Sequence, residues 1–179
     1  MDYNNNKQIE YGISELHFSI YDSKNKTFST PKILAAAAAI KLNPISYKLI
    51  FENINGENYS MGNDFFGYDG TLSIFDVSLD FLKNAFDYEI EGNGLVTEKL
   101  TISNKQIALL YTTSTNRVVY YNCKIERPDI NLETKAKQTT IAKLDLNVSI
   151  RAHNKEKIRS LCYDKSSEIY KNWFSGSCF

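Results

Sequence analysis

The chain of 179 residues has no net charge, because 21 lysines and arginines balance 21 acidic residues, and 42% of it is hydrophobic. This length and composition are ordinary for one globular domain with a buried core, and no apolar run approaches the roughly 20 residues of a membrane-spanning helix. The polar N-terminus lacks the apolar stretch of a signal peptide, so we expect a protein that is made and folded in the cytoplasm.

The first third of the chain predicts strands that follow a polar start. Residues 1–8 are rich in asparagine, and we expect them to form an N-terminal arm. In residues 9–21 apolar and polar side chains alternate, as in a strand with one buried face. Residues 31–44 combine five alanines, which favour helix, with an alternating end and a proline at each boundary, so strand is favoured. Residues 45–52 predict another strand.

A long polar segment precedes the only clear amphipathic helix. Residues 53–66 contain two glycines and four asparagines, which predicts a long loop or the tip of an extended hairpin. Residues 67–74 then alternate with the period of a strand. We expect the helix itself at about residues 78–90, ended by the glycines of residues 91–94.

Three apolar side chains and one cap define that helix. Leu79, Leu82 and Phe86 recur at three and four residues, the spacing of one helical face. Ser78 stands where an N-cap is needed, and Asp80 adds a negative charge to the first turn. We therefore expect a β-structure with a single helix packed against it.

The second half of the chain predicts more strands. Residues 106–112 form a short apolar run typical of a strand buried on both faces, and residues 117–126 are rich in β-branched and aromatic side chains. Residues 95–102 predict a strand less clearly, and residues 129–138 predict a polar connection. Residues 139–151 alternate most regularly, which predicts one buried face and one face in water.

The last segment, residues 152–179, predicts a C-terminal extension of the β core. A helix at about residues 164–174 fits the sequence, and it would carry several aromatic side chains. These aromatics fit two arrangements, packing on their own domain or docking on a neighbouring subunit. We thus expect a single domain over residues 1–179, with its β core at residues 9–151.

The sequence contains no pattern that predicts catalysis or metal binding. Cys123, Cys162 and Cys178 are odd in number and lack the CxxC spacing of zinc sites, so reduced thiols are expected. His17 and His153 are the only histidines, and a lone strand histidine is usually a satisfied surface group. Phosphate-loop, HExxH and nucleophile-elbow motifs are absent from the sequence. We therefore predict no catalytic, cofactor-binding or metal-binding residue, no cofactor, and no enzyme.

Charge is distributed unevenly along the chain. Residues 1–100 carry 14 acidic and 8 basic side chains, whereas residues 101–179 carry 7 and 13. The simple explanation is a solvated surface; the alternative is that surfaces of opposite sign meet head to tail in an assembly. The acidic excess is densest around the predicted helix, where Lys83 is the only base. The acidic side chains there are Glu57, Asp64, Asp69, Asp76, Asp80, Asp87, Glu89 and Glu91.

The order of several short motifs resembles that of a known family. GYDGTL at residues 67–72 is followed by LDFLK at 79–83, EGNG at 91–94 and ALLY at 108–111. YYNC at residues 120–123, Arg127-Pro128, a threonine-rich strand at 139–151 and a late Trp173-Phe174 complete the series. The ordered set resembles the major tail protein, or tail-tube subunit, of long non-contractile-tailed bacteriophages that infect low-GC Gram-positive bacteria.

The resemblance implies a fold, a location and partners. It implies a β-sandwich or barrel-like tail-tube fold with one flanking helix, a long loop and terminal arms. Such subunits form six-membered rings, which stack into a tube whose lumen passes DNA without sequence-specific binding. The other partners would be tail proteins, namely the tape measure, the terminator and the distal tail protein, and no membrane. The mature location would be the tail of the virion.

Two kinds of alternative remain open from the sequence. The first is another tail component of the same fold, such as a terminator or distal adaptor. The second is a monomeric β-sandwich that binds carbohydrate, with stacking groups drawn from the tyrosines Tyr59, Tyr68, Tyr120 and Tyr121. Under the tail-tube hypothesis, residues 53–66, the N-terminal arm and the segment after 152 make contacts between rings, and deleting 55–63 blocks tube growth. Residues 139–151 are one candidate for the lumen wall, although Lys143 and Arg151 are cationic.

Overall fold

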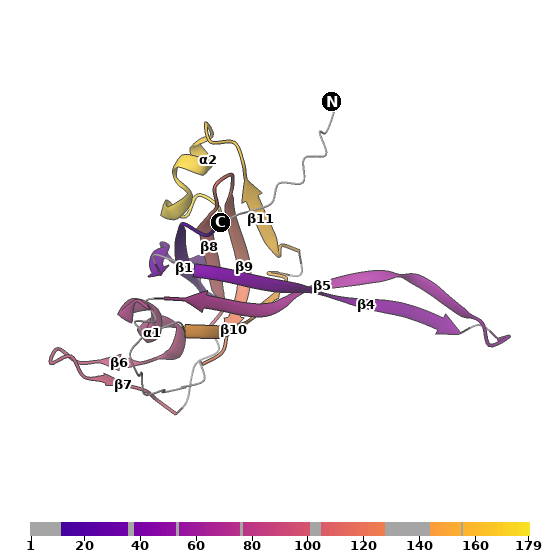
Figure 1. Ribbon diagram of the computed structural model, residues 1–179, viewed down its shortest axis with the longest axis horizontal. Coiled ribbons are helices and arrows are strands. Elements are labelled where there is room, and N and C mark those ends of the chain that lie inside the picture. The colour runs from indigo at the N-terminus through magenta and orange to yellow at the C-terminus, as the bar shows by residue number, and fades with distance from the viewer. Residues whose placement is uncertain are drawn as a thin grey trace, which may run out of the picture.

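The computed structural model describes residues 12–35, 38–52, 54–75, 77–100, 105–127, 144–154 and 156–179. The predicted fold class is confirmed: the chain is mainly β, with few helical residues (Figure 1). The strands are β1 (Glu15–Asp22), β2 (Thr27–Phe28), β3 (Lys32–Ala35), β4 (Ala38–Glu52), β5 (Asn58–Ile74), β6 (Glu89–Ile90), β7 (Val96–Thr97), β8 (Ile107–Thr112), β9 (Arg117–Ile125), β10 (Leu144–Arg151) and β11 (Arg159–Cys162). The helices are α1 (Leu79–Phe86), α2 (Glu168–Lys171) and a 3-10 turn at Trp173–Ser175.

Nine of the strands in the described residues belong to one antiparallel sheet. Its order is β2-β1-β8-β9-β10-β5-β4, while β3 pairs with the free side of β1 and β11 pairs with β9. A bridge between Ile13 and Ala38 brings the start of β4 next to the segment before β1. The sheet therefore curls until its two ends meet, which protects part of the edge that an open sheet would expose.

The main core fills the inside of this curled sheet, and α1 packs against it. Phe81, Ala85 and Phe86 of the helix are buried, and the rings of Phe18 and Phe81 meet edge to face with centroids 5.1 Å apart. The sheet contributes the other buried side chains, among them Leu16, Leu72, Ile74, Leu109, Val118, Leu146 and Ile150. Burial of these apolar groups is the main favourable term in the folding of such a domain.

The predicted helix exists, but it is shorter than expected and buries a different set of side chains. The Ser78 hydroxyl accepts a hydrogen bond from Phe81 N, as an N-cap should, and donates one to Ile33 O at 3.0 Å. The helix ends at Phe86 because Asp87 takes the left-handed conformation (φ 56°) and caps it. Residues 91–94, which we expected to stop the helix, form the turn between β6 and β7. Leu79 was expected on the buried face, but its side chain is exposed.

A C-terminal cap, which we define as Tyr163–Phe179, covers the outer face of β8 and β9. Trp173 is 2% exposed and packs with Ala108, Leu110, Val119 and Tyr121. The aromatics of this segment therefore dock on their own domain, which was one of the two predicted arrangements. Strand β11, which leads into the cap, was not predicted, since four residues are too few for a periodicity to be recognised.

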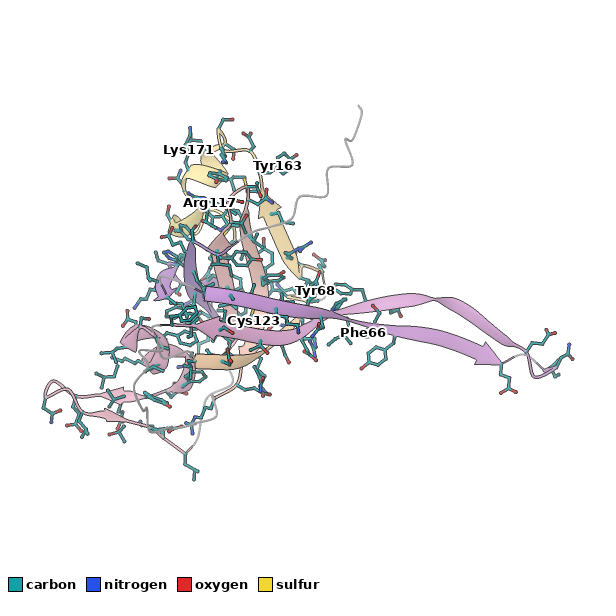
Figure 2. The ribbon with its side chains drawn as sticks, viewed as in Figure 1. Phe66, Tyr68, Arg117, Cys123, Tyr163 and Lys171 are labelled. Carbon is teal, nitrogen blue, oxygen red and sulfur yellow. The ribbon has the colours of Figure 1, made fainter. Side chains whose placement is uncertain are left out.

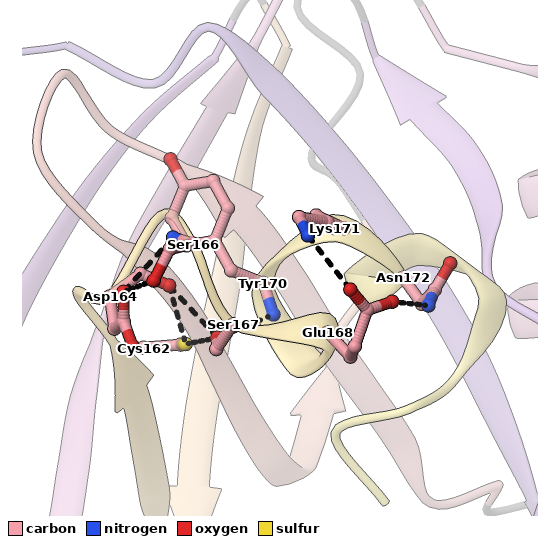
Figure 3. Close-up of polar contacts among 8 residues, drawn as sticks. All are labelled: Cys162, Asp164, Ser166, Ser167, Glu168, Tyr170, Lys171 and Asn172. Carbon is pink, nitrogen blue, oxygen red and sulfur yellow. Dashed lines mark hydrogen bonds and ion pairs between the residues drawn. The ribbon is translucent and has the colours of Figure 1, made fainter.

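Local polar contacts shape the cap (Figure 3). The Ser167 hydroxyl accepts a hydrogen bond from Tyr170 N at 3.1 Å, which starts α2, and Asp164 Oδ1 accepts one from Ser166 N at 2.9 Å. Lys171 Nζ lies 2.7 Å from Glu168 Oε1 one turn away. This short helix lies within the segment 164–174 in which a helix was expected.

The cap also overturns the expectation of a half-buried strand at residues 9–21. Both faces of β1 are covered from Leu16 to Ser19. His17 is 7% exposed, and its ring stacks on Phe174 of the cap with centroids 3.9 Å apart, so it is not a surface group. The polar face of this strand is buried because a segment more than 150 residues away in the chain folds over it.

Several strand predictions are confirmed within the described residues, including those at 45–52 and 67–74, which lie within β4 and β5. Residues 107–112 form β8, which is buried on both faces, and residues 117–125 form β9. β10 has the predicted alternation: Leu146, Val148 and Ile150 are buried, whereas Asp145 and Asn147 are exposed. The predicted strand at 95–102 is reduced to β7. The N-terminal arm, residues 101–102, the connection at 129–138 and residues 139–143 lie outside the described residues.

Residues 38–52 form one long strand where the sequence predicted two segments separated by Pro44. Proline has no backbone N–H, which excludes it from central strands but not from a sheet edge. β4 is the last strand of the sheet order, so Pro44 can lie within it opposite Tyr68. Residues 53–66 were expected to form a long loop or the tip of an extended hairpin, and those that the structure describes form the hairpin tip, since β5 begins at Asn58 and pairs with β4.

Candidate assembly surfaces

The longest projection of the molecule is the outer part of the β4–β5 hairpin. The last pair between β5 and β10 is Gly67 with Arg151, and beyond it β4 and β5 pair only with each other out to Glu52 and Asn58. We call residues 46–66 the arm; Figure 1 shows it extending from the body to one side, past every other strand. At about 3.3 Å per residue, its seven residues of β4 span about 23 Å.

The arm leaves the body at a β-bulge. Ile45 pairs with Gly67 but Ser46 pairs with Phe65, so Phe66 is an extra residue in β5. A bulge bends its strand and increases the local twist, which accounts for the change of direction at this point. A second register shift lies farther out, between Leu49 and Ile50.

Aromatic side chains at the root of the arm connect it to the core (Figure 2). Phe65 meets Tyr68 edge to face with centroids 5.1 Å apart, and Tyr68 meets the buried Tyr120 at 5.9 Å. On the outer side, Tyr47 and Phe66 form another edge-to-face pair at 4.8 Å. Tyr47, Phe65 and Phe66 keep between 46% and 60% of their surface exposed, so this root is an apolar patch available for contact.

The tip of the arm combines one apolar side chain with flanking carboxylates. Ile54 is fully exposed, and Glu52 and Glu57 stand on either side of the turn that contains it. Gly56 takes a positive φ of 78°, which allows this tight turn. The periodicity of the sequence does not indicate that the tip is a contact point. Its position at the end of a projection does indicate this.

A second surface is the polar face shared by β4, β5 and β10. Lys41 lies opposite Thr71, which in turn lies opposite Asn147, and Ser149 lies opposite Asp69. Arg151 Nη1 lies 2.8 Å from Asp69 Oδ1. Hydrogen bonds from Arg151 and Ser149 lower the pKa of the Asp69 carboxyl. The cationic Arg151, which counted against this strand as a lumen wall, is therefore paired; Lys143 lies outside the described residues.

Several of the acidic side chains around the helix α1 form ion pairs. Asp80 pairs with Lys32 at 3.0 Å, Asp87 with Lys105, and Glu89 with Lys99. The pairs Asp87–Lys105, Asp69–Arg151 and Glu98–Arg127 join the two halves of the chain, whereas Asp80–Lys32 and Glu89–Lys99 lie within residues 1–100. This leaves less charge for the predicted head-to-tail attraction than the sequence division indicates. Asp76 lies outside the described residues.

The cysteines and histidines do not converge on a reactive centre. The three thiols are free in the described structure, and burial raises the pKa of Cys123 well above its ordinary value and that of Cys178 to about 12. Such thiols are poor nucleophiles. Across the described residues, no group of three or more His, Cys, Asp or Glu side chains is placed to hold a metal ion.

Of the tyrosines considered for carbohydrate stacking, Tyr120 and Tyr121 are about 96% buried and Tyr68 is half-buried. Buried rings cannot form an exposed platform for a sugar. Tyr121 does line part of a pocket of about 550 Å³, between the turn after β1 and the end of the chain. The side chain of Tyr59 lies outside the described structure.

That pocket has an aromatic floor and a charged rim. Phe28 stacks on Phe179 with centroids 4.3 Å apart, and Tyr121 and His153 complete the floor. The rim includes Lys26, Lys157 and Glu156 together with several Ser, Thr and Asn side chains. Of these positions only Tyr121 was considered as a binding residue from the sequence, because the lining comes from four separate segments of the chain.

The longest helix among the described residues, α1, has eight residues, and no helix in that part of the chain could cross a membrane. No protein-family model matches the chain, and no curated protein matches it. Its similarity to solved structures is limited to distant shape matches.

One of these structures is the sheath/tube terminator of an extracellular contractile injection system, PVC, in its extended state. It has 10% sequence identity and a TM-score of 0.41, over 87% of this chain and 99% of that one. The anti-feeding prophage cap, a tube-terminating cap, has 13% identity and a TM-score of 0.37, over 91% and 99%. A chain of the PVC sheath–tube complex in the extended state has 10% identity and a TM-score of 0.37, over 88% and 94%. TM-scores this low establish neither a common fold nor a common function.

Proposed function

We propose that this chain is a structural tail protein, a tail-tube subunit that assembles with copies of itself through the β4–β5 arm. The observation that carries the proposal is the arm itself. An isolated two-stranded hairpin is marginally stable in water, and its unpaired edges attract other strands. A projection of about 23 Å with apolar groups at root and tip is best explained by a surface on a neighbouring molecule that covers it.

In the proposed assembly, six subunits form a ring, and rings stack into the tube through which DNA passes. The order of motifs from GYDGTL to Trp173-Phe174 supports this assignment. On the polar face of β4, β5 and β10, which we propose as a lumen wall, Arg151 is held by Asp69, and Lys41 is the remaining exposed cation among the described residues. Unpaired cations facing the lumen would bind phosphate and slow the passage of DNA. The subunit has no catalytic role in this proposal, and its location is the virion tail, after synthesis in the host cytoplasm.

The test is to shorten the arm without disturbing the sheet. Tyr47 pairs with Asp64, so residues 48–63 can be replaced by Asn-Gly, a two-residue turn that suits a hairpin. This is a cleaner change than deleting 55–63, which would leave residues 48–52 of β4 without their partners. We expect the shortened chain to fold and to remain monomeric.

Negative-stain electron microscopy and sedimentation over a range of concentrations give the result. Rings or hollow tubes from the native chain, with none from the shortened chain, support the proposal. Tubes of normal length from the shortened chain would exclude the arm as the assembly element. Single rings that never stack favour the alternative of a terminator or distal adaptor. A monomer whose melting temperature rises with an oligosaccharide would favour the binding module, with the aromatic pocket as its site.

A further inference from the structure

The aromatic pocket and the tip of the arm have complementary chemistry. The tip presents Ile54, fully exposed, between Glu52 and Glu57. The pocket presents an apolar floor beneath two lysines. Within one molecule the two cannot meet, because the arm extends away from the body that contains the pocket (Figure 1). We propose that the pocket receives the arm tip of a second copy of this chain.

The floor of the pocket can accept a branched aliphatic side chain. The rings of Phe28 and Phe179 are parallel, and Phe179 keeps 40% of its surface exposed. The Tyr121 ring is held in place, since its hydroxyl donates a hydrogen bond to Cys178 O at 3.0 Å and is hydrogen-bonded with the Ser160 hydroxyl at 2.8 Å. A rigid apolar surface of this kind loses little entropy when Ile54 covers it.

The charges on the rim select an acidic tip. Lys26 and Lys157 are both exposed, and Lys157 Nζ lies 5.9 Å from the ring centre of Tyr121, so its charge stands over the floor. Glu156, also on the rim, opposes them and leaves a net positive charge. The exposed apolar patch at Ile33 and Leu79 is a weaker match, because the neighbouring Lys32 is already paired with Asp80.

This contact is head to tail, since the donor and acceptor surfaces differ. Such contacts close into rings or extend into filaments, according to the rotation between copies. The inference therefore rests on the proposed function and deepens it, by naming the surface that receives the arm. It also assigns a role to the end of the chain, because Ser175, Gly176 and Phe179 line the pocket.

Charge reversal provides the first test. We expect Glu52→Lys with Glu57→Lys to weaken self-association about tenfold or more, and Lys26→Glu with Lys157→Glu to do the same. The chain that carries all four changes should regain association, because its basic arm tip again meets a pocket rim of opposite charge. Glu156→Gln should tighten association, since it removes the opposing charge. The matched control is Glu168→Lys with Lys171→Glu, an exposed ion pair on α2, which should change nothing.

A crosslink tests the contact even if tubes do not form unaided. One copy carries Ile54→Cys and the other Thr30→Cys on the pocket wall, both with Cys162→Ser and Cys178→Ser, and circular dichroism verifies folding. We expect disulfide-linked pairs at roughly ten times the yield found when Leu100→Cys, a fully exposed position elsewhere, replaces Thr30→Cys.

The outcomes separate the two proposals. Tubes from the native chain, together with equal crosslink yields and no effect of charge reversal, overturn the pocket assignment and leave the tail-tube function standing. A specific crosslink without rings or tubes supports the pocket and counts against the tube. If the native chain forms no tubes and no specific crosslink is found, both proposals are overturned.

Discussion

Two glycines in the GYDGTL motif are required by the close approach of neighbouring backbones. A Cβ added at Gly70 would lie 1.8 Å from Lys41 O, and one at Gly67 would lie 2.0 Å from Ile150 O. Gly67 also has a φ of 139°, which disfavours other residues. These positions allow β5 to lie between β4 and β10 at the point where the arm leaves the body.

We expect Gly70→Ala to destabilise the fold by about 3 kcal/mol or more, because backbone must move to admit the methyl group. Urea unfolding followed by circular dichroism measures the free energy of unfolding. Gly92→Ala is the matched control: an added Cβ there meets nothing within 4 Å, and stability should change little. Equal stability of the two variants would contradict the crowding at Gly70.

We expect one histidine, His153, to make the free energy of unfolding depend on pH near neutrality. Burial, and secondarily the charge of Lys157, lower the pKa of His153 below its ordinary value. The unfolded chain therefore binds more protons than the folded chain below about pH 6.5, so stability falls as the pH drops through that value. We expect His153→Gln to flatten this slope between about pH 7 and pH 5 in urea titrations. An unchanged slope would show that His153 does not cause it.

Among the elements, the C-terminal cap depends on a stack of rings and one cation. The Arg117 guanidinium lies 4.4 Å from the ring centre of Tyr170 and 5.1 Å from that of Phe174, and Phe174 stacks on His17 (Figure 2 labels Arg117). This joins the cap to β1 and β9. Trp173, the only tryptophan of the chain, is buried within the cap, so its fluorescence reports on the state of the cap.

Arg117→Lys should loosen the cap, because a lysine ammonium cannot stack on aromatic rings as a planar guanidinium does. We expect a loss of about 1 kcal/mol and a red shift of Trp173 fluorescence at lower urea concentration than in the native chain. Lys171→Ala, which removes a half-exposed ion pair of α2, is the control and should leave the transition in place. If the Trp173 fluorescence of Arg117→Lys shifted at the same urea concentration as in the native chain, the ring stack would not be what holds the cap in place.

For the whole molecule, the arm determines the largest dimension. Because it extends freely from the body (Figure 1), small-angle scattering of dilute native protein should show an elongated particle. Replacing residues 48–63 with Asn-Gly should shorten the maximum dimension by about 20 Å without changing circular dichroism. A maximum dimension that stays the same would mean that the arm folds back onto the body in solution.

The sequence by itself determined the mainly β class, strands β8, β9 and β10, and the start of α1 at Ser78. These features depend on local periodicity and capping, which a chain carries wherever it is placed. The β4 side of the arm was predicted as a strand at residues 45–52, whereas residues 53–66 were left as a choice between a loop and the tip of an extended hairpin. A hairpin surrounded by water needs no apolar face, so its sequence need not show the alternation of apolar and polar side chains that predicts a strand.

The tertiary structure decided the rest. It buried His17 beneath the cap, placed Pro44 on a sheet edge, ended α1 at Asp87 and paired the acidic side chains with distant lysines. It also gathered Lys26, Tyr121 and Phe179 around one pocket. Each of these outcomes depends on contacts between residues far apart in the chain, which is why the spacing of neighbours could not reveal them.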